Sequence, residues 1–87
     1  MSRPMFIDVR EPFEFTASHI PGAINIPLGS FANSLTKELK NVSRDTEIII
    51  YCRSGARAAV AVQYLVQMGF TNVTNGINEN AIRQQQI

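Results

Sequence analysis

The chain has 87 residues, of which 45% are hydrophobic and 17% are charged, a size and composition that suit one domain with a hydrophobic core. Its formal net charge is +1 and its eight Lys and Arg residues are scattered, so nothing indicates a surface for nucleic acid or for a charged membrane. A single cysteine excludes an internal disulfide, and no apolar run reaches the roughly 18 residues of a membrane span. The start, MSRPMFIDVR, has no apolar segment of the signal-peptide kind, so we expect a cytoplasmic protein, or a periplasmic one if a leader was removed.

The first third of the chain predicts a strand, a helix and a second strand. Residues 5–9 (MFIDV) form a short apolar stretch that ends in charge, which is typical of a strand. Residues 11–18 carry a proline where the first turn of a helix tolerates it, and they predict a helix of two turns. Residues 23–26 (AINI) lie between prolines and glycines and predict a short strand.

An amphipathic helix is predicted after Ser30, whose hydroxyl can cap it. Apolar side chains follow at spacings of four, four and three residues. They are Phe31, Leu35, Leu39 and Val42. This spacing places them in one stripe, which we expect to face the core.

The second half of the chain predicts a buried strand followed by a helix. Residues 47–52 (EIIIYC) are apolar without alternation, as in a central parallel strand covered on both faces. Residues 56–68 predict a helix, residues 71–75 a last short strand, and residues 77–87 either a final helix or a frayed tail. Alternating strands and helices predict an α/β fold: a small parallel sheet with helices on both faces, in a single domain over residues 1–87.

Cys52 lies at the predicted carboxyl end of the most buried strand, where open α/β sheets bind ligands. The next residues, RSGAR, turn into the amino end of a helix, whose free N–H groups and dipole favour an anion. Gly55 permits a tight turn, and Arg53 and Arg57 add positive charge. Because each effect favours thiolate over thiol, we expect a lowered pKa and a reactive cysteine; the alternative is a buried, inert one.

The length of this loop separates two kinds of chemistry. Tyrosine-type phosphatases and their arsenate-reducing relatives use a C-x5-R loop around a tetrahedral oxyanion, and sulfurtransferases use a loop one residue shorter. Here the fifth residue after Cys52 is Arg57, which gives C-x4-R, and the sixth is Ala58. The smaller cradle favours a persulfide over a phosphate, and phosphatase or arsenate reductase activity remains the less favoured alternative.

Four segments in order, FIDVREPFEF, HIPGAINIPL, YCRSGARA and LVQMGFTNV, resemble the rhodanese family of sulfurtransferases in its short, single-domain form. The chain is similar to the small stress-associated bacterial rhodaneses. The resemblance implies a rhodanese-like fold with Cys52 as the catalytic nucleophile and no metal or organic cofactor. It also implies that the loop residues bind the substrate. These are Arg53, Ser54, Gly55, Ala56 and Arg57.

The activity that the resemblance implies is that of a thiosulfate:cyanide sulfurtransferase. Cys52 would take the outer sulfur of thiosulfate, or of a persulfide donor, and pass it to cyanide or a thiol. The implied partners are these small molecules and a thiol protein, without nucleic acid or membrane. An alternative is a sulfur carrier that docks on a partner protein and turns over poorly with small molecules.

Three other polar residues have two interpretations each. Asp8 and Arg10 could line the active site, but we favour a buried ion pair that locks the strand end, with Glu11 or Glu14 satisfying Arg10. His19 could be a general base for the cysteine, but we favour a structural role in the HIPGA turn. One His and one Cys supply too few ligands for a metal site.

Overall fold

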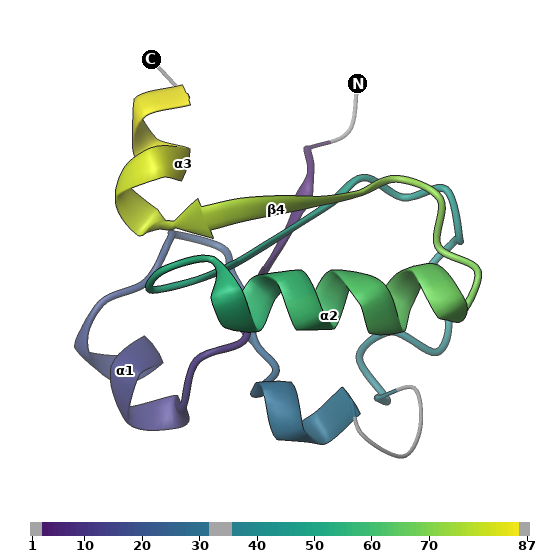
Figure 1. Cartoon of the computed structure of the whole chain (residues 1–87), viewed down its shortest axis with the longest axis horizontal. Helices are drawn as coiled ribbons and strands as arrows, with labels where there is room; N and C mark the ends of the chain where they lie inside the picture. The colour runs from purple at the N-terminus through teal and green to yellow at the C-terminus, as the bar shows by residue number, and fades with distance from the viewer. Residues whose placement is uncertain (1–2, 32–35, 86–87) are drawn as a thin grey trace.

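A computed structural model describes residues 3–31 and 36–85 (Figure 1). Strands and helices alternate along the chain, with one short 3-10 helix, η1. The elements are β1 (Met5–Asp8), α1 (Pro12–Ala17), β2 (Ile24–Asn25), η1 (Leu28–Phe31), β3 (Ile48–Cys52), α2 (Ala56–Gln67), β4 (Val73–Asn78) and α3 (Glu79–Gln85). None of the helices in this described part of the chain is long and apolar enough to span a membrane.

The four strands form one parallel sheet in the order β2-β1-β3-β4. β1 and β3 occupy the centre, and Ile7 of β1 pairs with Ile50 of β3. Parallel strands place all their carboxyl ends at one edge of the sheet. Accordingly, α1, the loop between β3 and α2, and α3 gather at one side of the molecule (left in Figure 1).

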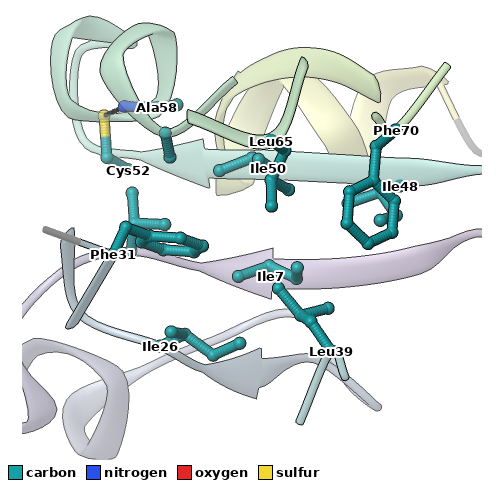
Figure 2. Packing of buried hydrophobic residues seen from close by; sticks show 12 residues of the cluster. Ile7, Ile26, Phe31, Leu39, Ile48, Ile50, Cys52, Ala58, Leu65 and Phe70 are labelled. Carbon is teal, nitrogen blue, oxygen red and sulfur yellow. Dashed lines mark hydrogen bonds between the residues drawn. The ribbon is translucent and has the colours of Figure 1, made fainter. Parts of the chain in front are cut away.

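Side chains from both faces of the sheet are buried, as predicted for β3. Ile48, Ile50 and Cys52 face the larger core beneath α2, which Figure 2 shows. Tyr51 faces the opposite, smaller core with Ile82 of α3, because successive side chains of a strand alternate between faces. The predicted α/β fold with helices on both faces is therefore confirmed.

Helix α2 packs closely on the sheet through small residues. Ala58, Ala61 and Leu65 form its buried face, and two of these three side chains are single methyl groups. Gly55 and Gly69 flank the helix with φ angles of 93° and 98°, a left-handed conformation that glycine adopts at least cost. The predicted helix over residues 56–68 is thus confirmed to within one residue.

The amphipathic helix predicted after Ser30 is wrong in the described part of that segment. η1 ends at Phe31, Leu35 lies outside the described residues, and residues 36–42 form turns in which Leu39 N donates to Thr36 O at 3.0 Å. Phe31 and Leu39 are nevertheless fully buried, as the stripe predicted. Their burial against the sheet outweighs the local preference for a helix.

Strand β4 covers Val73–Asn78, so it begins two residues later and ends three residues later than the predicted strand over 71–75, and it contains a bulge. Ile50 pairs with Asn75 and Tyr51 with Ile77, so Gly76 is an extra residue. Ile77 has a φ of 73°, which is strained for a β-branched residue. The final helix, one of the two alternatives for residues 77–87, is present as α3.

Replacing Gly76 with alanine is expected to lower the free energy of unfolding by about 1–3 kcal/mol, the usual cost of an overpacked core. A Cβ atom there would lie 2.7 Å from Ile49 Cγ2 and 3.0 Å from Ile82 Cδ1. Urea unfolding measures the loss. Gly29→Ala is the matched control, because nothing lies within 4 Å of the added atom. Equal stability of the two variants would contradict this packing.

Candidate active site

The loop after β3 wraps around the sulfur of Cys52. Cys52 is the last residue of β3 and only 2% of its surface is exposed. Its Sγ accepts hydrogen bonds from the backbone N–H groups of Gly55 at 3.1 Å and Ala58 at 3.4 Å, and Figure 2 shows the second of these beside the first turn of α2. The left-handed conformation of Gly55 makes this reversal of the chain possible.

These amides stabilise the thiolate form of Cys52. Burial of the sulfur raises its pKa, but the backbone N–H groups of Ala58, Ser54, Gly55 and Arg57 lower it by more, so that the pKa lies below the ordinary value for cysteine. A lowered pKa at a helix amino terminus is typical of reactive cysteines. The predicted effect of the loop on the thiol is present in the structure.

A pocket of about 390 Å³ opens beside Cys52. Its walls come from the end of β1, from α1, from the cysteine loop and from the start of α3. The lining residues are Arg10, Phe13, Glu14, Ala17, Ser18, Cys52, Arg53, Asn78, Glu79 and Asn80. Within residues 3–31 and 36–85, no group of three or more His, Cys, Asp or Glu side chains could hold a metal ion.

The two loop arginines have different surroundings. Arg57 donates to both carboxylate oxygens of Glu14, at 2.8 and 3.2 Å, and so ties the cysteine loop to α1. The Arg53 side chain is 74% exposed on the pocket wall, and its nearest carboxylate oxygen belongs to Glu14, 3.9 Å away. Arg53 is therefore the more available of the two for an anion.

Asp8 and Arg10 form the predicted buried ion pair. Arg10 Nη2 lies 2.6 Å from Asp8 Oδ2, and Asp8 is fully buried. The same guanidinium donates to Ser18 O at 2.6 Å and lies 3.4 Å from Glu79 Oε1, so the suggestion that Glu11 or Glu14 satisfies it is wrong. The hydrogen bond with Asp8 raises the pKa of Arg10 above its usual range.

Glu79 is a pocket residue that the sequence alone did not identify. Besides its ion pair with Arg10, it accepts a hydrogen bond from Ser18 Oγ at 2.8 Å and one from Arg83 at 3.3 Å. These contacts join α3 to the loop after α1, which is more than sixty residues away in sequence. No local sequence pattern signals such a contact.

His19 has the structural position that we favoured. Its Nδ1 donates to Phe15 O at 2.7 Å, and its ring stacks on the Phe15 ring with centroids 3.7 Å apart. Among the described residues, His19 is not part of the wall beside Cys52. The geometry supports a packing role for His19 and gives it no contact with the sulfur.

The Glu14–Arg57 pair is expected to make stability depend on pH. The hydrogen bond from Arg57 is the main reason why the pKa of Glu14 falls to about 2, below the ordinary value for a glutamate. Because the folded-state pKa is lowered, the stabilisation is present above about pH 4.5 and is lost as the pH falls towards about 2.

The melting temperature of the wild type should therefore fall more steeply over this range than that of Glu14→Gln. Glu38→Gln, at an exposed position, is the control and should keep the wild-type slope. Equal slopes for the wild type and Glu14→Gln would contradict the pair.

The structure is an α/β domain whose single cysteine lies at the carboxyl edge of a parallel sheet, in a turn whose backbone N–H groups donate to its sulfur. The family model for the Rhodanese-like domain matches residues 1–78. The chain therefore belongs to the rhodanese-like family of sulfurtransferases.

Individual relatives support this assignment. A sulfurtransferase of Allochromatium vinosum is 34% identical over 82% of the chain and 63% of its own length. YrkF, a candidate sulfur carrier protein of Bacillus subtilis, is 38% identical over 79% of the chain and 35% of its own length. The chain thus spans less than two thirds of these curated relatives. Among solved structures, a rhodanese with anions from E. coli superimposes with a TM-score of 0.78 at 30% identity, covering 91% of each chain.

Proposed function

We propose that the protein is a sulfurtransferase that carries sulfane sulfur as a persulfide on Cys52, with thiosulfate or a persulfide as donor and cyanide or a thiol as acceptor. The observation that carries the proposal is the pair of amide contacts to Cys52 Sγ, from Gly55 at 3.1 Å and Ala58 at 3.4 Å. Donors aimed at a sulfur stabilise negative charge both on a thiolate and on a persulfide bound in the same place.

The first half-reaction transfers sulfur to the protein. The Cys52 thiolate attacks the outer sulfur of thiosulfate and forms a new S–S bond. The S–S bond of the donor breaks, and sulfite leaves with its electron pair. Cys52 then carries Cys–S–S⁻, and the balance needs no other oxidant or reductant.

The second half-reaction transfers the sulfur from Cys52 to the acceptor. Cyanide or a thiolate attacks the outer sulfur of the persulfide, and thiocyanate or a new persulfide leaves. The Cys52 thiolate is regenerated with the electron pair of the broken S–S bond. Two separate half-reactions on one covalent intermediate predict ping-pong kinetics.

The residues from Arg53 to Arg57 are the proposed binding site for the anionic donor. Arg53, on the pocket wall, supplies the more exposed charge, and the guanidinium of Arg57 is shared with Glu14. The backbone amides of Ser54, Gly55 and Ala56 belong to the same turn. The rhodanese from E. coli was solved with anions, so a protein similar to this chain binds them.

The testing experiment is an intact mass measurement before and after incubation with thiosulfate. The expected result is a gain of one sulfur atom that cyanide reverses. If no sulfur is gained although Cys52 remains open to alkylation, thiosulfate is not the donor. The mass measurement is then repeated after incubation with a persulfide donor. If Cys52 gains no sulfur from this donor either, the proposal is overturned.

A second candidate function, as a sulfur carrier for a partner protein, is favoured by one observation. Phe13, on the wall of the Cys52 pocket, is 75% exposed, and exposed aromatic side chains are common at protein interfaces. A similar role appears in the name of the relative YrkF. A carrier would gain sulfur in the mass experiment but produce thiocyanate slowly in repeated turnovers, whereas an enzyme would do both.

A further inference from the structure

Two asparagines of β4 hold the cysteine loop through its backbone carbonyl groups. Asn75 Nδ2 donates to Gly55 O at 2.9 Å, and Asn78 Nδ2 donates to Arg53 O at 3.3 Å. Both acceptors are carbonyl oxygens of the turn that wraps Cys52. Together the two contacts fix the turn at its first residue, Arg53, and at Gly55, the residue just before α2.

The bulge in β4 brings the two asparagines to the same loop. In a regular strand, side chains three residues apart face opposite sides of the sheet. The extra residue Gly76 shifts the register, so that Asn75 pairs with Ile50 and Asn78 with Cys52. The cost is the strained φ of 73° at Ile77, and such strain is found mostly where the surrounding structure requires it.

The contact of Asn78 sets the direction of one amide. In a trans peptide the C=O and the following N–H point in opposite directions. Because the Arg53 carbonyl points to Asn78, the Ser54 N–H is directed to the other side, where Cys52 lies. The Ser54 amide is one of those that lower the pKa of Cys52.

The contact of Asn75 holds the first turn of α2. Gly55 O accepts from Asn75 and also from Ala59 N, at 2.9 Å in each case, so the asparagine is joined to the start of the helix. The Ala58 N–H that reaches the Cys52 sulfur belongs to this same turn. Asn75 Oδ1 in turn accepts from Ile77 N at 2.9 Å, which fixes the side chain in place.

We infer that Asn75 and Asn78 are positioning residues, which keep the amides of the loop directed at Cys52 Sγ. Neither needs to touch the transferred sulfur. The inference rests on the proposed function only in taking Cys52 as the reacting group, and alkylation of Cys52 tests it without any sulfur transfer.

Serine substitutions test the two contacts separately. In the wild type, Asn78 Oδ1 caps α3 by accepting a hydrogen bond from Ala81 N at 2.8 Å. In Asn78→Ser the serine hydroxyl can still accept this hydrogen bond, but the shorter side chain cannot reach Arg53 O. In Asn75→Ser the hydroxyl can still bond the Ile77 amide but not Gly55 O. Neither change adds charge. Asn72→Ser, at an exposed asparagine just before β4, is the control.

The measurement is the rate of Cys52 alkylation by iodoacetamide as a function of pH, which gives the apparent pKa. We expect each serine variant to raise this pKa by about one unit, which lowers the thiolate fraction about tenfold at a pH below it. Because a thiolate of higher pKa is also a stronger nucleophile, alkylation should slow by about threefold there, and at a pH above the pKa of every protein the variants should react at least as fast as the wild type. Asn72→Ser should keep the wild-type profile.

An unchanged pKa in folded Asn75→Ser and Asn78→Ser would overturn the inference. If Asn75→Ser does not fold, Asn78→Ser alone decides, because its cap on α3 is retained. A shifted pKa together with no gain of sulfur from any donor would support the positioning role and overturn the sulfurtransferase proposal. A gain of sulfur by Cys52 together with unshifted pKa values in both serine variants would support the sulfurtransferase proposal and overturn the positioning role.

Discussion

Cys52→Ser is expected to reduce sulfur transfer by more than about a thousandfold, because a hydroxyl at this position cannot form a persulfide. The loop amides would remain in this variant. Without the thiol, however, binding of the donor should not lead to turnover. The measurements are thiocyanate production from thiosulfate and cyanide, and the intact mass after incubation with thiosulfate. Neither thiocyanate above background nor a gain of sulfur is expected.

The control for this experiment is the stability of the variant. Oxygen is smaller than sulfur and accepts hydrogen bonds from the same amides. The free energy of unfolding of Cys52→Ser should therefore lie within about 1.5 kcal/mol of the wild-type value. A folded variant without transfer would support the assigned role of the thiol. A folded variant that still produced thiocyanate at the wild-type rate would refute the persulfide mechanism.

The second large effect is on stability: Arg10→Met is expected to lower the free energy of unfolding by about 3–5 kcal/mol, the usual cost of breaking a buried ion pair. The change leaves Asp8, which is fully buried, without its guanidinium partner, which lies 2.6 Å away in the native protein. The Arg10 side chain also contacts Ser18 O and Glu79, so the substitution removes the contacts that join the end of β1 to the loop after α1 and to α3. Urea unfolding measures the change.

Two further variants make the Arg10 experiment specific. Arg3→Met removes an exposed arginine of the same chain and should change stability little. Adding Asp8→Asn to Arg10→Met removes the uncompensated charge and should recover part of the loss, since paired residues are not additive. A loss of less than about 1 kcal/mol in Arg10→Met would place this pair among weak surface pairs.

The cysteine loop was predictable because its chemistry is local in sequence. Cys52, Gly55 and Arg57 stand within six residues, and the apolar run before them identifies the central strand. The lowered pKa of Cys52 was predicted from the helix amino terminus, the turn at Gly55 and the two arginines, and in the structure the backbone N–H groups lower it. The prediction was less complete for Arg57, because its partner Glu14 lies forty-three residues earlier in the chain.

The features that could not be predicted depend on contacts between distant segments. Glu79 reaches Arg10 only because α3 and β1 meet at the same edge of the sheet. The bulge at Gly76 places Ile77 in a conformation that its side chain disfavours, so the residue type gives no signal of it. The spacing of Phe31 and Leu39 correctly predicted burial, but the same spacing falsely indicated a regular helix.

The strand order has a consequence for the order of events in folding. β1 is central, yet it pairs with β3, and Ile7 must find Ile50 across a long intervening segment. Closing such a loop costs chain entropy before any contact compensates for it, so non-local parallel pairing is slow. The turn around Cys52 is held by Asn75 and Asn78 of β4, which are synthesised after it. During synthesis the thiol therefore exists for a time without the two side-chain contacts that hold its loop in place.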